Sequence, residues 1–364
     1  MIFIIIQILT EPGYEKSSWG KTTLEGLISA LIKKKLEFSN AASISSVKKQ
    51  EEFQYLIIIG SDEKWLGNVL SYCDKINVHP IILSNVTRTF SNVIYSSVTS
   101  DIEKSMYYLI HYLKKRGKTK PALYGINPAS VSDLARKENF LTFAHGIATA
   151  EDIFYNNGSL EKCFENFFAD YKKYDCIICA NDYAAISLSR NLKKKQVPED
   201  RFLTVSYGGT LLSKKISSLL TVSMCYEEYG KAAIAICETL SKNPALLYLN
   251  IAVKWKINNV DSLSVNGQPT THHTVNPTSL NITDEIFYSD REMLEMILVE
   301  NMLSTCDAVD FKILDLLLMG RSYEVVADNC YISHNTVKYR TKKLMDICKT
   351  QTKKDFLNLV KKYY

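Results

Sequence analysis

The sequence has no stretch of about 20 consecutive apolar residues, which is the length that a membrane-spanning helix needs. Its most apolar segment is the opening run 2–6, which Ile8 and Leu9 continue. No basic residue precedes this run, the polar turn 10–13 follows it at once, and no small-residue cleavage site comes after it, whereas a signal peptide needs these features. We therefore expect a buried first strand in a cytoplasmic protein with no membrane partner.

Sequence motifs of the common enzyme classes are also missing. Gly20-Lys21-Thr22 resembles the end of a phosphate-binding loop, but Glu15 stands where the first glycine is required, so the backbone cradle is absent. There is no Gly-x-Ser-x-Gly, no His-x-x-x-His pair and no set of kinase motifs. We expect neither enzymatic activity nor a cofactor.

The cysteines form no disulfide framework. There are nine, an odd number, scattered from Cys73 to Cys348, which is typical of a reducing cytosol. Cys176 and Cys179 form a Cys-x-x-Cys, but they lie in an apolar run that predicts a central strand, so we expect core packing. The adjacent His272 and His273 lie in a polar stretch without acidic or cysteine neighbours, and we expect no metal site there.

What the sequence does contain is an alternation of apolar runs and amphipathic segments over residues 1–257. Helical spacing between the runs, as in 24–32, predicts an α/β fold with parallel sheets covered by helices on both faces. At 364 residues the chain is too long for one ordinary core. The apolar runs that predict strands are 3–9, 55–60, 80–84, 122–125, 176–180 and 202–207.

The composition changes after this region. Residues 258–284 are polar and rich in turn residues, which predicts a linker. Residues 285–304 have helical spacing, and this connecting helix either pairs with a symmetry mate or caps the domain that follows. Residues 305–364 predict a small all-α domain of four short helices, beginning near Asp307, Ser322, Ser333 and Lys353.

Positive charge is concentrated at this end of the chain. Residues 333–364 hold nine basic residues against two acidic ones, a local balance of +7, whereas the whole chain carries +5. Such a cluster is typical of a surface that binds phosphates. The alternatives are a solvated helix face and a small helical protein-interaction module.

Residues 305–364 resemble the DNA-binding domain of LuxR-type regulators. The shared features are the Gly320-Arg321-Ser322 turn, the small Ala327, and Ile332-Ser333-x-x-Thr336-Val337-Lys338 with Leu344 two turns later. One departure is that the usual acidic pair of the first helix is reduced to Asp310.

The resemblance implies a helix-turn-helix whose third helix enters the major groove of duplex DNA. Val337 and Leu344 would face the core. Base-facing positions would be those of Lys338, Tyr339 and Lys342, while candidates for phosphate contacts and capping are Ser333, Asn335, Thr336 and Arg340.

Residues 1–257 resemble the two-lobed, periplasmic-binding-protein-like sensor of the lactose-repressor family, nearest its xylose-responsive branch. The matching blocks are 19–27, Ser130-Val131-Ser132 with Arg136-x-x-Asn139-Phe140, and a long block beginning at Cys179-Ala180-Asn181-Asp182 and continuing through 205–207, 219–222 and 229–230. The resemblance implies a sugar-like effector in a cleft between the lobes, where lobe closure controls the DNA-binding part.

The ligand-binding residues that this resemblance implies are Tyr14, Trp19, Arg136, Asn181, Asp182 and Tyr207. Arg136 would hydrogen-bond ligand hydroxyls, and Trp19 and Tyr14 would stack on a ring or pack in the core. For Asp182, capping the following helix is the alternative role.

Two departures affect the expected ligand. Ser206-Tyr207-Gly208-Gly209 stands where the family usually has Gly-Tyr-Asp-Asp, and Met224 replaces a polar residue. The ligand is therefore expected to be less polar or anionic, or small-molecule binding has been lost and the sensor serves dimerisation or a protein partner. A third departure is that the sensor precedes the DNA-binding domain.

The sequence thus predicts a homodimeric regulator that binds duplex DNA under the control of a small molecule. A periplasmic solute-binding protein is the rival that would explain residues 1–257, but the basic C-terminal domain counts against it.

Overall fold

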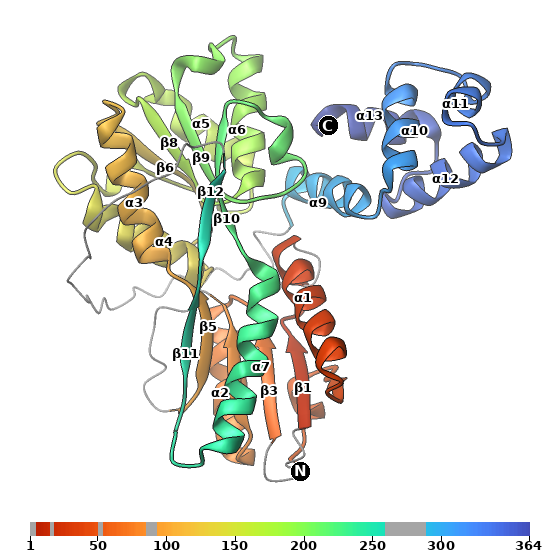
Figure 1. Cartoon of the computed structure of the whole chain (residues 1–364). Coiled ribbons are helices and arrows are strands. Elements are labelled where there is room, and N and C mark those ends of the chain that lie inside the picture. Colours follow the sequence, from red (N-terminus) through yellow and green to blue (C-terminus); the bar gives the residue numbers. More distant parts are fainter. Residues whose placement is uncertain (1–4, 15–17, 50–53, 85–92, 259–288) are drawn as a thin grey trace.

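Two six-stranded sheets and a group of C-terminal helices make up the computed structural model, which describes residues 5–14, 18–49, 54–84, 93–258 and 289–364 (Figure 1). Each sheet carries helices on both faces and forms one lobe. The α/β class, the two lobes and the additional C-terminal helices are as the sequence predicts.

Lobe 1 is built on an entirely parallel sheet in the order β11-β5-β4-β3-β1-β2. Its strands are β1 (Ile5–Thr10), β2 (Phe38–Asn40), β3 (Gln54–Ile59), β4 (His79–Leu83), β5 (Ser96–Ser100) and β11 (Asn250–Val253). Its helices are α1 (Ser18–Lys34), α2 (Glu63–Ile76) and α7 (Tyr226–Lys242).

The isoleucine-rich strand β3 shows why this sheet is covered on both faces. Alternate residues of a strand point to opposite faces, so Ile57 and Ile59 pack with α1 and α7, while Leu56 and Ile58 pack with α2. α1 and α7 cross closely at Gly230, where a Cβ would lie 2.5 Å from the Cα of Leu27.

Lobe 2 has the order β12-β10-β9-β8-β6-β7 and is parallel except for the antiparallel edge pair β10–β12. Its strands are β6 (Pro121–Ile126), β7 (Ile153–Tyr155), β8 (Cys176–Cys179), β9 (Leu203–Gly208), β10 (Leu219–Met224) and β12 (Trp255–Asn258). α3 (Ile102–Lys115) and α4 (Val131–Phe143) cover one face, and α5 (Leu160–Ala169) and α6 (Asp182–Lys194) cover the other. Single 3₁₀ turns lie at Ile44–Ser46, Ala150–Asp152, Tyr171–Lys173, Glu199–Arg201 and Ser213–Lys215.

The Cys-x-x-Cys lies on β8, as expected from its apolar surroundings. Both thiols are fully buried, and burial raises the pKa of each. Because residues three apart on a strand point to opposite faces, Cys176 packs with α3 and α4 while Cys179 packs with α5 and α6. The two sulfurs therefore belong to separate cores. Among the described residues, no group of three His, Cys, Asp or Glu side chains is placed to hold a metal ion.

The chain passes between the lobes three times. The passages join β5 to α3, β10 to α7, and β11 to β12. In the third, only Lys254 separates an edge strand of lobe 1 from an edge strand of lobe 2, and Figure 1 shows both strands running along the same side of the molecule.

Five helices follow residue 288, and all are capped, including the two for which the sequence predicts caps at Ser322 and Ser333. They are α9 (Arg291–Ser304), α10 (Ala308–Leu318), α11 (Tyr323–Cys330), α12 (His334–Ile347) and α13 (Lys353–Tyr363). Each begins with an Asp, Ser or Thr side chain that accepts a hydrogen bond from the amide three residues later, namely Asp290, Asp307, Ser322, Ser333 and Thr352. We call α10–α13 the head. β12 ends at Asn258, and the rest of the expected linker, with His272 and His273, lies outside the described residues.

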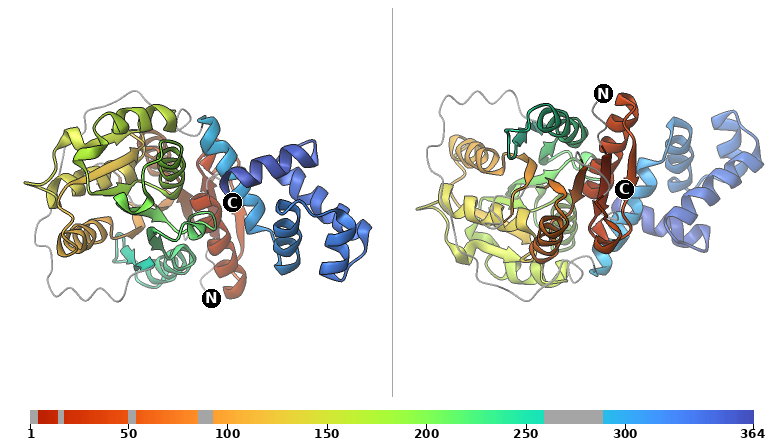
Figure 2. Two further views of the ribbon diagram at one scale, coloured as in Figure 1. Left: turned by 90° about the horizontal axis from the view of Figure 1, so that it is seen from above. Right: turned by 90° about the horizontal axis from the view of Figure 1, so that it is seen from below.

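The connecting helix α9 packs on the head and on lobe 2 together. Its buried residues, among them Met296 and Leu303, share one apolar cluster with Tyr183 of α6 and with Leu344 and Phe356 of the head. This helix was expected either to pair with a symmetry mate or to cap the domain that follows. In the structure it packs on the head of the same chain, which is the second of these roles. Figure 2 shows the head lying to one side of both lobes in both views.

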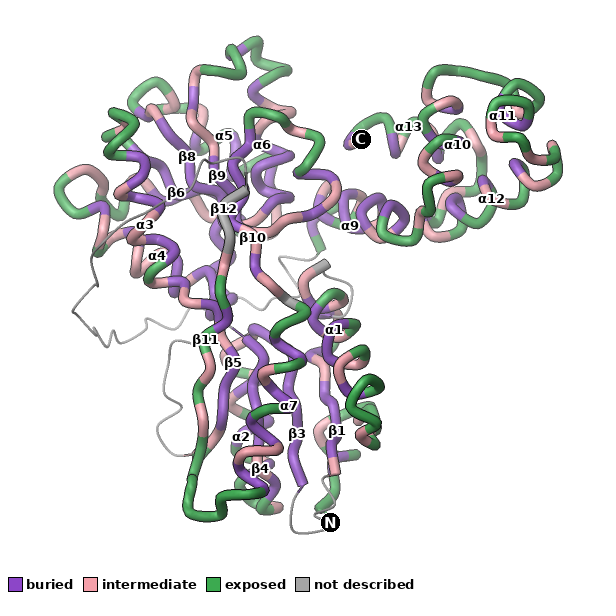
Figure 3. The backbone as a smooth tube through the Cα atoms, viewed as in Figure 1, coloured by how far each residue is buried: buried purple, intermediate pink, exposed green. Residues whose placement is uncertain are grey.

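The buried residues lie mainly in the two sheets and where α9 packs on its neighbours (Figure 3). Much of the surface of the head is exposed by comparison, including Tyr331 and Tyr339. None of the helices in the described segments is long and apolar enough to cross a membrane.

Candidate functional site

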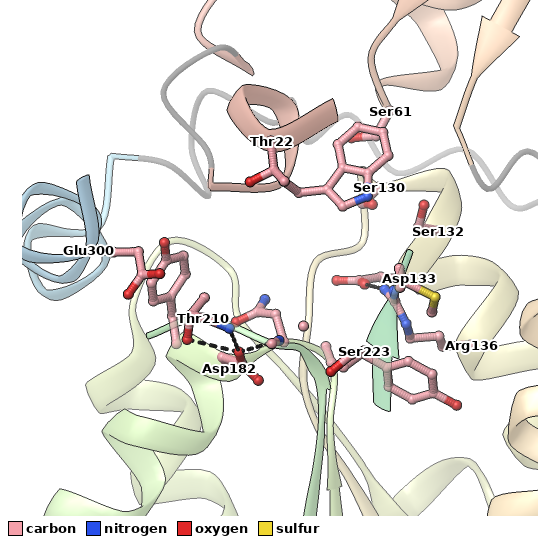
Figure 4. Close-up of a pocket in the computed structure, with 18 of the residues that line it drawn as sticks. Thr22, Ser61, Ser130, Ser132, Asp133, Arg136, Asp182, Thr210, Ser223 and Glu300 are labelled. Atoms are coloured by element: carbon pink, nitrogen blue, oxygen red, sulfur yellow. Dashed lines mark hydrogen bonds and ion pairs between the residues drawn. The ribbon is translucent and has the colours of Figure 1, made fainter. Parts of the chain in front are cut away.

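A cleft of about 560 Å³ lies between the lobes, within the range of small-molecule sites. Loops at the carboxyl ends of strands from both sheets line it, as expected for open α/β sheets. Figure 4 shows Thr22 and Ser61 of lobe 1 on one side and Asp182, Thr210 and Ser223 of lobe 2 on the other. All six ligand-binding residues predicted from the sequence line this cleft.

The lobes touch at one edge of the cleft. Asp62 and Ser130 form an antiparallel bridge, and the backbone amide of Val131 donates to the carbonyl of Ser61 at 3.2 Å. The carboxylate of Glu11, after β1, accepts from the amide of Ser61 at 2.6 Å and so holds the lobe 1 side of this contact. The cleft is therefore closed on this side by backbone contacts between the lobes.

Arg136 on α4 points into the cleft, but a neighbour in sequence already engages it (Figure 4). Its guanidinium forms an ion pair with Asp133 and lies 4.7 Å from the centre of the Tyr207 ring. Asp133 also accepts from the amide of Asn127 at 2.9 Å. Burial raises the pKa of the Asp133 carboxyl, and the charge of Arg136 opposes this rise. The Nε of Arg136 is buried and has no hydrogen-bond partner among the described residues.

Asn181 and Asp182 have roles different from those expected. The side chain of Asn181, not that of Asp182, caps α6 by accepting from the amide of Ala184 at 2.9 Å. The buried carboxylate of Asp182 instead accepts four hydrogen bonds from the loop after β9 and from β9 itself. The donors are the Ser206 hydroxyl at 2.5 Å, the amides of Gly209 and Thr210 at 2.7 Å each, and the Thr210 hydroxyl at 2.8 Å. Asp182 is thus occupied in shaping the wall of the cleft.

The Gly208-Gly209 pair, which departs from the family pattern, has a steric reason. A Cβ on Gly208 would lie 2.5 Å from Oδ2 of Asp182, and a Cβ on Gly209 would lie 2.9 Å from the hydroxyl of Ser223. Gly209 has a φ of +120°, which side chains rarely adopt. Two glycines therefore allow the loop to close onto Asp182: a side chain at position 208 would meet that carboxylate, and one at position 209 would meet Ser223.

The predicted aromatic residues differ in how far they reach the cleft. Tyr14 is buried in the lobe 1 core and contacts the ring of Trp19 edge-on at 5.0 Å. Trp19 itself is half-buried. Tyr207 lies beneath Arg136, and its hydroxyl is 3.3 Å from that of Ser105. Trp19 is therefore the predicted aromatic residue best placed to meet a ligand ring.

Several lining residues were not predicted from the sequence. Ser61, Asn127 and Thr210 follow the ends of β3, β6 and β9, and the rule that sites form at the carboxyl ends of parallel strands was a usable signal for them. Met293 and Glu300 come from α9, outside both lobes, and no sequence signal pointed to them.

The second candidate site is the outer face of α12. Val337, Thr341, Leu344 and Met345 are buried, and this confirms the inner face predicted from the sequence. The opposite face exposes Asn335, Lys338, Tyr339 and Lys342. Lys342 also pairs with Asp346 at 2.8 Å, but both side chains are largely exposed, so this pair is readily exchanged for another partner.

Other residues predicted to contact phosphates are already bonded to neighbouring residues of the head. The guanidinium of Arg340 lies 2.9 Å from Asp307 and 2.8 Å from Asp310, and these carboxylates raise its pKa. The hydroxyl of Ser333 accepts from the amide of Thr336 at 3.1 Å and lies 2.8 Å from the Thr336 hydroxyl. The structure therefore places Arg340 as the link between α12 and the start of α10, and Ser333 as a helix cap.

Comparison with known proteins identifies the fold of the lobes. No protein-family model and no curated protein matches the sequence. Among solved structures, a complex of the transcriptional regulator CelR with cellobiose matches with a TM-score of 0.59 and 11% identity, covering 70% of this chain and 83% of that one. The lac repressor bound to ONPG matches with a TM-score of 0.58 and 15% identity, covering 71% and 81%.

A third match is the trehalose repressor from Escherichia coli, with a TM-score of 0.52 and 17% identity, covering 71% of this chain and all of that one. At these identities the likeness is one of fold: the two lobes have the same architecture as the matching parts of these three regulators.

Proposed function

We propose that this chain is a DNA-binding transcriptional regulator, controlled by a small polar molecule in the interlobe cleft. Its lobes would be a lactose-repressor-type sensor, nearest the xylose-responsive branch, and its head a LuxR-type helix-turn-helix. The observation that carries the proposal is the exposed basic face of α12, presented by a capped helix pair in the same chain as a ligand-sized cleft. The protein would act in the cytosol as a homodimer, because one head contacts one half-site.

The head supports DNA binding through its geometry. α11 ends at Cys330, and the next residue, Tyr331, has a φ of +56° and turns the chain sharply toward α12. The buried residues Val326 and Val337 hold the two helices together, so the outer face of α12 is presented as a rigid surface. A helix held in this way fits the major groove, where lysine side chains reach guanine acceptors.

The DNA-binding proposal is tested on duplexes selected from a random library with the wild-type protein. Lys338→Ala and Lys342→Ala are each expected to weaken binding to a selected duplex by about 1–3 kcal/mol, or about 5- to 150-fold. Lys33→Ala, which removes an exposed lysine from α1, serves as the control and should bind as the wild type does. Equal losses on selected and random duplexes would assign these lysines to phosphates, and unchanged binding by both variants would contradict the proposal.

The charges around the cleft favour an uncharged or cationic effector over an anionic one. Five carboxylates line the cleft against two cations, a balance of −3: Asp133, Asp182, Glu227, Glu228 and Glu300 against Arg136 and Lys214. The positive ends of α4, α6 and α7 also face the cleft, but each carries a carboxylate in its first turn that offsets the helix dipole. Because Arg136 is already paired with Asp133, an anion would find little compensation there.

Thermal unfolding of the full chain tests this choice with three matched compound types: neutral sugars, their amino analogues and their uronic acids. A ligand at about 100 times its dissociation constant should stabilise the protein by about 2.7 kcal/mol. We expect stabilisation by neutral or amino compounds and none by the acids. Stabilisation by an acid alone would contradict the charge argument.

A second function remains as an alternative because the polar groups of the cleft are so largely engaged by the protein. Asn181, Asp182 and Glu300 all hold backbone amides, and the lobes already touch at Ser130. In this alternative the sensor takes no small molecule and serves dimerisation or a protein partner. If no compound of the thermal panel stabilises the protein while DNA binding is intact, this alternative would be favoured.

A further inference from the structure

The connecting helix α9 forms a third wall of the cleft. Met293 and Glu300 line the cleft although they belong to neither lobe, and Figure 4 shows Glu300 reaching from α9 toward the loop after β9. The side chain of Glu300 is buried, with the residue 6% exposed. A ligand that fills the cleft therefore lies against an element that also packs on the head.

The loop 208–212 is held by two buried carboxylates, one on each side. Asp182, on α6, accepts from the amides of Gly209 and Thr210. Glu300, on α9, accepts from the next two amides, those of Leu211 at 2.7 Å and Leu212 at 3.0 Å. Four consecutive amides are thus shared between a helix of the cleft and the connecting helix, so the loop cannot shift without breaking bonds to one of them.

The opposite side of α9 is fixed to the head. Glu295 accepts from Nζ of Lys362 at 2.6 Å and from the hydroxyl of Tyr363 at 2.8 Å. Met302 and Leu303 lie in the apolar cluster that includes Leu344 of α12. A displacement of α9 therefore reaches α12 through packed side chains, without an intervening flexible segment.

We propose that Glu300 is a positioning residue that couples the loop 208–212, and with it the occupancy of the cleft, to the placement of α9 and the head. This inference rests on the proposed function, because it gives the effector cleft a direct connection to the DNA-binding helix. A ligand that contacts Thr210 would displace the loop 208–212. Because Glu300 is bonded to two amides of this loop, α9 would move with it.

Hydrogen exchange of the full chain tests the coupling without ligand or DNA. Thr210→Val perturbs the cleft side, because it removes the hydroxyl that donates to Asp182 and accepts from the amide of Ser213. We expect several-fold faster exchange in residues 209–213 and also in α9 and α12. When the same change is made together with Glu300→Gln, the loop should still exchange faster, while α9 and α12 should no longer respond to the change at Thr210.

Glu292→Gln is the matched control for Glu300→Gln. It makes the same change on the same helix, but Glu292 bonds to Ser187 and Arg190 of α6 and not to the loop. The response of α12 to Thr210→Val should survive in this background. Should Glu300→Gln fail to fold, Glu300→Asp keeps the charge while drawing the carboxylate away from the loop, and the same comparison applies.

The proposal is overturned if α9 and α12 do not respond to Thr210→Val in the wild-type background. It is also overturned if they respond as strongly once Glu300 has been replaced. Either result would leave the DNA-binding and thermal experiments untouched, so failure of the coupling is distinguishable from failure of the proposed function.

Discussion

Replacing Asp182 by alanine is expected to lower the free energy of unfolding of lobe 2 by about 3–5 kcal/mol, although the residue lines a cleft where a ligand role is the obvious assignment. The carboxylate is 1% exposed and accepts from two amides and two hydroxyls. Alanine would leave these donors buried with no acceptor, and each such donor costs about 1–3 kcal/mol, less where water or a small shift compensates.

Urea unfolding followed by circular dichroism measures this effect. Asp200→Ala, which removes an exposed carboxylate from the same lobe, is the control and should change the unfolding free energy by less than about 0.5 kcal/mol. An Asp182→Ala protein as stable as the control, but with an altered ligand response, would make Asp182 a ligand-binding residue after all.

The second large effect concerns the buried ion pair of Arg136 and Asp133. Arg136→Met keeps an apolar contact with Tyr207 but leaves Asp133 buried without its counter-charge, and removing one partner of a buried pair typically costs about 3–5 kcal/mol. Adding Asp133→Asn should recover part of the loss, because the remaining side chain is then neutral and still accepts from Asn127. The four proteins form a double-mutant cycle measured by urea unfolding.

The pH dependence of the unfolding free energies shows whether the loss of stability in Arg136→Met comes from the buried charge of Asp133. Burial raises the pKa of Asp133 in the folded state, so its contribution to stability is fully present below the ordinary pKa of a carboxyl and is lost as the pH rises through the raised one. Without Arg136 that pKa rises further. The loss in Arg136→Met should therefore be smaller at mildly acidic than at mildly alkaline pH, and Asp133→Asn should remove the difference. A loss that is the same at both pH values would point to packing instead of charge.

This pair also changes how a ligand role for Arg136 is tested. A simple truncation of Arg136 disturbs the fold and the cleft together, so an absent ligand response would not be informative alone. Comparing Asp133→Asn with the double variant separates the two, because both lack the buried acidic charge and differ only at the arginine.

Whether a strand could be predicted from the sequence depended on how completely the strand is buried. The six strands expected from apolar runs all occur, because strands covered on both faces must be apolar throughout. Six strands were not expected, namely β2, β5, β7, β10, β11 and β12. β2 and β7 have three residues each, β5 is the mostly polar run Ser-Ser-Val-Thr-Ser, and β11 is a partly exposed edge strand in which Asn250 and Ala252 face solvent. Such strands are determined by their neighbours in the sheet and leave little periodic signal of their own.

The head was predicted most closely, because its signals are local. Each cap and the amide that it accepts from are three residues apart, so the start of every helix was visible in a short window. The role of Arg340 was not visible in the same way. Its partner Asp310 is 30 residues away in sequence, and only the packing of α10 against α12 brings the two together.

In the cleft, contacts between residues far apart in the sequence limit prediction even more. The six residues predicted by resemblance all line the cleft, but the protein groups to which several of them are bonded were not predicted. Asp182 acts on a loop 27 and 28 residues later, and Glu300 acts on amides 88 and 89 residues earlier. A contact across that distance depends on how helices pack on a finished lobe, which residue type and spacing do not record.

The three passages of the chain between the lobes also determine the order in which the protein is completed on the ribosome. β5 ends at Ser100, but α7 and β11, which finish lobe 1, begin only at Tyr226 and Asn250. At roughly 5–20 residues per second, the 126 residues from Ser100 to Tyr226 take roughly 6–25 s to synthesise. During that interval β5 has no β11 beside it, and the face of the sheet that α7 covers stays bare. The five parallel strands of lobe 2, β6 to β10, are all synthesised before α7 begins, so lobe 2 gains most of its sheet while lobe 1 still lacks α7 and β11. Lobe 1, although it lies nearest the N-terminus, is therefore the lobe that most needs protection in the nascent chain during this interval.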